Sequence, residues 1–151
     1  MRRILILDDD PRVRKALSLV LENEGFDVSL AADGRAGLDL LEQSEFDLVI
    51  VDIFMPGADG LETVRSLRRR LPRLPIIVMS GLRYGGSSQY HDLTVPDFLK
   101  MALQFGASFA LYKPFKPDDL LRAIHACGWS MGPDSPDRRS GESEQPDRQA
   151  S

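Results

Sequence analysis

The sequence has one cysteine, no excess of basic residues and no long apolar run. The single cysteine, Cys127, excludes an internal disulfide framework and suits a reducing compartment. A net charge of −4 gives no reason to expect direct nucleic-acid binding. No apolar run reaches the ~18 residues of a membrane span, and residues 4–7 are too short an apolar stretch for a signal peptide. We therefore expect a soluble, cytoplasmic protein.

A glycine-rich turn is also missing where a dinucleotide-binding fold would need one. Three carboxylates, Asp8, Asp9 and Asp10, directly follow the apolar residues 4–7, so that class of fold is disfavoured. What is present is enough apolar material for one domain, 42% of 151 residues.

Five short apolar segments alternate with helical patterns along this domain. The segments are residues 4–7, 26–31, 48–51, 75–79 and 109–112. Apolar residues recur at helical spacing in residues 11–25, 34–43, 61–71, 96–105 and 117–127. The alternation predicts an α/β fold with a five-stranded parallel sheet and helices on both faces. Asp10 and Pro11 suit the N-cap and first position of the first helix.

Three stretches do not contribute to the expected core. Residues 82–95 are too polar and rich in Gly and Ser, and too long for an ordinary connection, so we expect a lid, a binding loop or a mobile insertion. Residues 129–151 predict a disordered polar tail after a domain of residues 1–128, with no output domain. Trp129 and Met131 are the tail's only large apolar residues and are expected to pack back on the last helix. The third helix carries a basic side that we expect to be solvated: Arg65, Arg68, Arg69 and Arg70.

Reactive or charged side chains stand at the ends of four of the five expected strands: Asp8 and Asp9, Asp52, Ser80 and Lys113. In a parallel sheet these ends lie along one edge, so the residues converge. The gathered carboxylates would repel one another, and Mg²⁺, which prefers oxygen ligands, removes that repulsion. The ammonium and hydroxyl groups complete a receptacle for a phosphoryl group, with Asp52 as the nucleophile that would form an aspartyl phosphate. The alternative is that Asp52 merely ends its strand or caps the loop.

Four segments, in order and at fitting spacings, resemble the signature of response-regulator receiver domains of two-component signalling. They are ILILDDDPRVR, DLVIVDIFMPGADGLE, IIVMSG and LYKPF, and the resemblance spans about residues 3–127. It implies a doubly wound, flavodoxin-like sheet of order 2-1-3-4-5 with its site between the first and third strands. It also implies a cis Lys113–Pro114 peptide bond.

The resemblance implies a role for each matching residue. Asp52 would be the phosphoacceptor, and Asp8, Asp9, Asp52 and the backbone carbonyl of Phe54 would bind Mg²⁺. Ser80 would be the hydroxyl that turns toward the phosphoryl group, and Lys113 would pair with that group.

The function implied by this resemblance is that of a single-domain response regulator. It would accept a phosphoryl group from a histidine kinase or histidine phosphotransfer protein, and signal by protein–protein contact or phosphorelay. It would catalyse only its own phosphorylation and dephosphorylation, so it is not expected to be an enzyme with an external substrate.

Ala110 stands where the family usually has a switch aromatic residue, so the usual coupling of ring and hydroxyl is in question. The alternative function is a non-phosphorylated, receiver-like interaction module, which the presence of all five site residues disfavours. An Asp-nucleophile phosphatase is weaker, because Phe54 occupies the position where such enzymes carry a second carboxylate.

Overall fold

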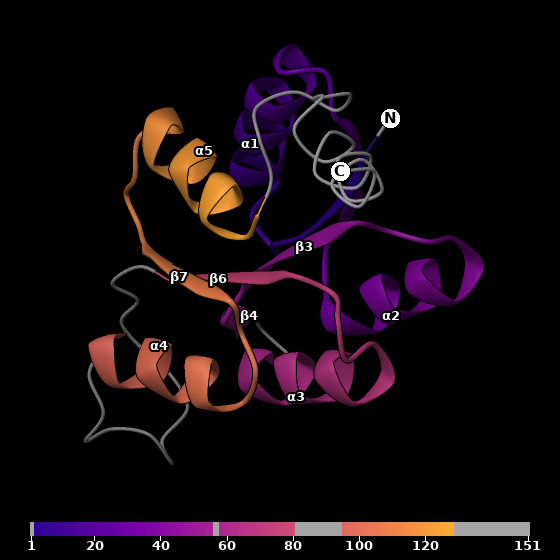
Figure 1. The fold of residues 1–151 in the computed structure, drawn as a ribbon, viewed down its shortest axis with the longest axis vertical. Coiled ribbons are helices and arrows are strands. Elements are labelled where there is room, and N and C mark those ends of the chain that lie inside the picture. Colours follow the sequence, from indigo (N-terminus) through magenta and orange to yellow (C-terminus); the bar gives the residue numbers. More distant parts are fainter. Residues whose placement is uncertain (1, 56–57, 81–94, 129–151) are drawn as a thin grey trace, which may run out of the picture.

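The computed structural model describes residues 2–55, 58–80 and 95–128, and these form one sheet enclosed by two layers of helices (Figure 1). The strands of the main sheet are β1 (Arg3–Leu7), β2 (Asp27–Ala31), β3 (Leu48–Asp52), β6 (Ile76–Ser80) and β7 (Phe109–Tyr112). The helices are α1 (Pro11–Asn23), α2 (Gly34–Gln43), α3 (Gly60–Arg70), α4 (Val95–Gln104) and α5 (Pro117–Ala126). A short hairpin follows β3, made of β4 (Phe54–Met55) and β5 (Ala58–Asp59).

The five strands are parallel and lie in the order β2-β1-β3-β6-β7. Counted within the sheet, this is the order 2-1-3-4-5, so the predicted fold class is confirmed. The chain runs outward from β1 to β2 and then returns to place β3 on the other side of β1. Ligands of such sheets bind beyond the carboxyl ends of the strands at this reversal, between β1 and β3.

Alternating side chains of the strands divide the core into two clusters. Figure 1 shows α1 and α5 on one face of the sheet, and α2, α3 and α4 on the other. Ile4 and Ile6 of β1 point into the α1/α5 cluster, whereas Leu5 and Leu7 point into the opposite one. The central strands are buried on both faces, which explains why their sequences are continuous apolar runs.

The helices begin where the sequence supplies acceptors for their first N–H groups. Asp10 is the N-cap of α1, and its side chain accepts a hydrogen bond from the Arg12 N–H, with Pro11 at the first helical position. Asp33 caps α2 in the same way through the Ala36 N–H. These caps fix the connections that follow β1 and β2.

The β4–β5 hairpin closes the connection between β3 and α3. Its pairing joins Phe54 to Asp59 and Met55 to Ala58. Gly60 then comes so close to the residue after β3 that an added Cβ would lie 2.1 Å from the Ile53 carbonyl oxygen. The Gly60 N–H donates to that same oxygen at 3.1 Å, so the chain closes tightly before α3 begins.

Arg68 does not belong to the solvated basic side that the sequence predicts for α3. Its guanidinium donates to the Gly106 carbonyl at 2.7 and 3.0 Å, and to the carbonyls of Leu71 and Pro72 at 3.1 and 2.7 Å. Burial lowers the pKa of Arg68. The prediction of a fully solvated face is therefore wrong at this residue, which joins the end of α3 to the turn before β7.

Several predictions concern residues outside the described ranges. The undescribed residues include 82–94 of the polar loop and the tail of residues 129–151. The expectations about disorder, about the loop's function and about Trp129 and Met131 stay predictions. Among the described helices, none is long and apolar enough to cross a lipid bilayer.

Candidate functional site

The carboxyl ends of four strands bring the predicted site residues to one edge of the sheet. Asp52 and Ser80 are the last residues of β3 and β6. Asp8 directly follows β1, and Lys113 directly follows β7. The parallel register aligns these ends, with Leu7 beside Val51 and Asp52 beside Met79.

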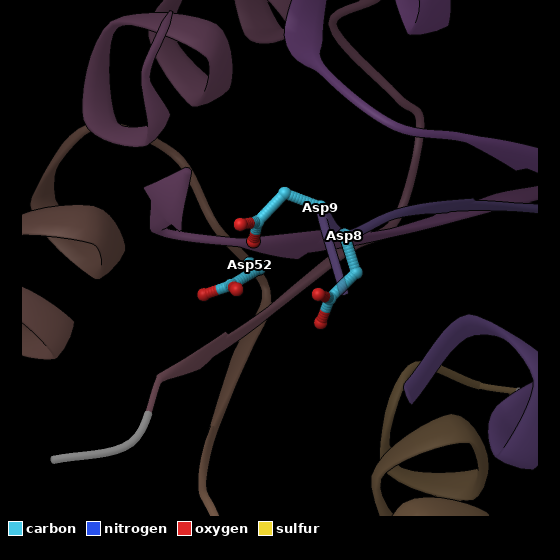
Figure 2. A group of neighbouring side chains, drawn as sticks. All are labelled: Asp8, Asp9 and Asp52. Carbon is cyan, nitrogen blue, oxygen red and sulfur yellow. The ribbon is translucent and has the colours of Figure 1, made fainter. Parts of the chain in front are cut away.

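Three carboxylates gather at this edge (Figure 2). Asp8, Asp9 and Asp52 each offer an oxygen, and these oxygens all lie within 4.8 Å of one another. Asp8 and Asp52 are buried, at 0% and 1% exposure, whereas Asp9 is partly exposed. Two buried carboxylates this close are costly unless cations offset their charge.

Lys113 supplies one such cation. Its Nζ atom lies 2.8 Å from Oδ2 of Asp8 and 3.2 Å from Oδ2 of Asp52. The Lys113 N–H donates to the Ser80 carbonyl at 2.7 Å, which fixes the lysine next to the end of β6. The following peptide bond to Pro114 is cis, as the resemblance implies.

Asp8 is held from several sides. Its Oδ1 accepts a hydrogen bond from the Asp10 N–H at 2.9 Å, and its carbonyl accepts one from Nη1 of Arg14 at 2.7 Å. The Asp8 N–H donates to Ala31 at the end of β2. The sequence contains no separate signal for Arg14, which reads as an ordinary helical arginine. Asp10 is the N-cap, and its backbone hydrogen bond from Arg12 lowers the pKa of its carboxyl group.

Ser80 is completely buried at the end of β6. Its partner in register on β7 is Tyr112, so the two side chains share the face of the sheet that α4 covers. Ala110 lies on this face too and packs against the same core cluster. Tyr112 is thus an aromatic residue directly beside Ser80, and it is 52% exposed.

The three carboxylates fit a divalent cation. Ligand oxygens on opposite sides of an octahedral Mg²⁺ lie about 4 Å apart, because each Mg–O distance is about 2.1 Å. The three carboxylate oxygens lie within 4.8 Å of one another, which is close to this spacing. Phe54, whose carbonyl is the fourth predicted ligand, lies two residues after Asp52 at the start of β4. Its ligand role stays a prediction.

The sequence matches the family described as the response regulator receiver domain over residues 4–125. Response regulator MprA of Mycolicibacterium vanbaalenii is 38% identical over 141 residues, which cover 93% of this chain and 55% of that protein. Cell cycle response regulator CtrA of Brucella ovis is 31% identical over 124 residues, which cover 82% and 49%. The chain therefore spans about half the length of these relatives.

Solved structures agree with this match. A CheY-like receiver domain protein of Methanospirillum hungatei superposes with a TM-score of 0.71 at 30% identity, covering 83% of this chain and 91% of that one. Response regulator TrrA of Thermotoga maritima, solved in complex with Mg(2+)-BeF, gives a TM-score of 0.67 at 30% identity. That superposition covers 84% of this chain and 99% of the other.

Proposed function

Because this chain belongs to the response regulator receiver domain family, we propose that Asp52 accepts a phosphoryl group and that residues 1–128 act as the receiver. The observation that carries the proposal is the convergence of three carboxylates and one ammonium at the switch point of the sheet. An isolated strand-ending aspartate would not need a lysine from a strand 61 positions away.

Asp8, Asp9 and Asp52, together with the Phe54 carbonyl, would hold Mg²⁺. The ion supplies charge neutralisation, both for the gathered carboxylates and for the oxygens of the transferred group. The proximity of the three carboxylate oxygens supports this ligand set. The family relative TrrA, solved with Mg(2+)-BeF, supports it as well.

The transfer itself would use the side chain of Asp52 as the nucleophile. One Asp52 carboxylate oxygen bonds to phosphorus, the bond from phosphorus to the donor's leaving atom breaks, and the donor keeps the electron pair. When the donor is a phosphohistidine, the freed imidazole nitrogen takes a proton from solvent.

Lys113 and Ser80 would hold the phosphoryl group once it is on Asp52. Nζ of Lys113 is already 3.2 Å from Oδ2 of Asp52, within reach of an oxygen on the added group. The Ser80 hydroxyl lies at the end of the neighbouring strand and can donate to another such oxygen. Both contacts would exist only with the phosphorylated protein, which makes them the signal that a partner reads.

The proposed donors are a histidine kinase or a histidine phosphotransfer protein in the cytoplasm. The protein would then act by protein–protein contact or pass the group onward in a phosphorelay. It would process no external substrate beyond its own phosphorylation and dephosphorylation. The relatives MprA and CtrA carry the words "response regulator" in their names, which supports this role.

The experiment is labelling of the full chain with acetyl phosphate, followed by intact-protein mass spectrometry. We expect an added mass of one phosphoryl group that requires Mg²⁺ and is lost in Asp52→Asn. Asp39→Asn, at an exposed carboxylate on α2, is the matched control and should label normally. Failure of the wild-type chain to label, in the presence of Mg²⁺, would favour the non-phosphorylated interaction module.

A further inference from the structure

A groove of about 660 Å³ lies at the opposite edge of the sheet from the carboxylates. Asp47 and Pro75 line it just before β3 and β6 begin, whereas Asp52 and Ser80 stand where those strands end. The groove is therefore separated from the proposed phosphorylation site by the full length of two central strands. Nothing in the proposed function uses it.

Much of the groove wall is apolar. Leu41 comes from α2, Phe46 from the segment before β3, and Leu71 and Leu74 from the segment after α3. Leu71 is 37% exposed, and Phe46 is only partly buried where it packs against the core. Partly exposed apolar side chains around a concavity favour an apolar occupant, because seating one removes more apolar surface from water.

The remaining wall is the end of α5, where the described chain leaves the domain. Cys127 and Gly128 both line the groove. The Gly128 N–H donates to the His125 carbonyl at 2.9 Å, and Gly128 has a φ of 95°. This is the left-handed glycine that ends many helices, and the residue after it often makes an apolar contact back to the last turn.

The residue after Gly128 is Trp129, the only tryptophan in the chain. Beyond Met131 the sequence to residue 151 has no large apolar residue. Trp129 and Met131 are thus the only large apolar residues that follow Gly128 in this sequence, and one residue separates them. Gly128, the residue before Trp129 in the sequence, lines the groove, and consecutive Cα atoms are 3.8 Å apart.

We propose that the groove is the binding site for the chain's own C-terminal segment, with the Trp129 indole seated against Leu71 and Leu41 and with Met131 covering its edge. The segment then joins the end of α5 to the ends of α2 and α3, across both helix layers. The Cys127 thiol is half-buried at this wall, and burial raises its pKa, as expected of a sheltered position. Arg73, Glu45 and Asp47 form a polar rim that suits the charged residues following Met131.

The test uses the fluorescence of the single tryptophan in the full-length chain. We expect blue-shifted emission and acrylamide quenching several-fold weaker than in the urea-unfolded chain. Leu71→Lys places an ammonium on the groove wall and should raise quenching toward the unfolded value. Leu19→Lys, at a 60% exposed leucine on α1, is the control and should leave quenching unchanged. Far-UV circular dichroism checks that each variant is folded.

A second measurement does not depend on any variant. In the wild-type protein, nuclear Overhauser contacts should join the Trp129 indole to methyl groups of Leu71 or Leu41. Quenching equal to that of the unfolded chain, or indole contacts to a different face, would overturn the proposal. Protection that disappears on dilution together with a dimer in sedimentation would also overturn it, because a second copy would then fill the groove.

Discussion

The Nζ atom of Lys113 lies 2.8 Å from Oδ2 of Asp8, although the two residues are 105 positions apart in the chain. The same atom is 3.2 Å from Asp52, so the lysine offsets the charge of two buried carboxylates at once. This contact joins β1 to β7 across β3 and β6, and it makes the last strand part of the site.

Removal of this ammonium should destabilise the protein. We expect Lys113→Gln to lower the free energy of unfolding by about 2–3 kcal/mol, because two buried carboxylates lose their cation. This loss is smaller than for a fully buried ion pair, because the Lys113 side chain is partly exposed. Mg²⁺ should restore part of the loss, since it binds the same carboxylates. Urea unfolding with and without Mg²⁺ measures both effects. Lys100→Gln, at an exposed lysine on α4, is the control. Equal stability of the two variants would contradict this account.

Gly60 should tolerate no larger side chain. A Cβ there would lie 2.1 Å from a backbone carbonyl, which cannot rotate away, so Gly60→Ala should cost more than about 2 kcal/mol. Gly128→Ala is the comparison, because its Cβ would meet nothing within 4 Å. This change should lower the free energy of unfolding by about 1 kcal/mol, through the left-handed φ alone. Urea midpoints give both values. A larger loss of stability in Gly128→Ala than in Gly60→Ala would show that close packing at Gly60 does not constrain the β3–α3 connection.

Arg68 should be required for its planar group rather than its charge. Arg68→Lys keeps the charge but cannot reach the Gly106, Leu71 and Pro72 carbonyls together, so we expect a loss of about 1–3 kcal/mol. Arg69→Lys, on the exposed side of α3, should change stability by less than about 0.5 kcal/mol. Thermal unfolding of the two variants measures the difference. If Arg68→Lys leaves the stability unchanged, water satisfies these carbonyls as well as the guanidinium does.

Asp119 should contribute to the acid sensitivity of the fold. The Lys116 N–H donates to Oδ2 of Asp119, and this bond, with the nearby Arg122, lowers the pKa of the carboxyl group below its ordinary 3.8. A carboxyl whose pKa is lower in the folded state stabilises the fold above its unfolded pKa, and this contribution is lost as pH falls through the folded value. Asp119→Asn should therefore be less stable than wild type near neutral pH, and the gap should shrink below the ordinary pKa.

Urea unfolding across this pH range, with Asp118→Asn as the control on the same helical turn, measures the effect. A stability gap that stays constant down to the acid transition would show that the N–H bond does not depend on the charge of Asp119.

The sequence predicts those parts of the fold that depend on local pattern. Strands buried on both faces are continuous apolar runs, as in β3. The start of α1 could be predicted because the N-cap Asp10 directly precedes Pro11. The site residues could be named because the carboxyl ends of parallel strands lie along one edge of the sheet. Four of these ends carry reactive or charged side chains.

The parts that escaped prediction depend on contacts between distant segments. The β4–β5 hairpin pairs strands of two residues each, too short for an apolar pattern to reveal them. Arg68 resembles its exposed neighbours in sequence, and its different role comes from the Gly106, Leu71 and Pro72 carbonyls that surround its guanidinium. The groove beside Cys127 arises from three separate chain segments, none of which carries a signal alone.

The central claim is that Asp52 becomes phosphorylated, and mapping the modified residue tests it most directly. The chain is labelled with acetyl phosphate and Mg²⁺, reduced with borohydride to convert the acyl phosphate to a stable alcohol, and digested for tandem mass spectrometry. We predict that the conversion falls on Asp52. Conversion of another residue, or of none although phosphoryl groups are supplied in excess, would contradict the account.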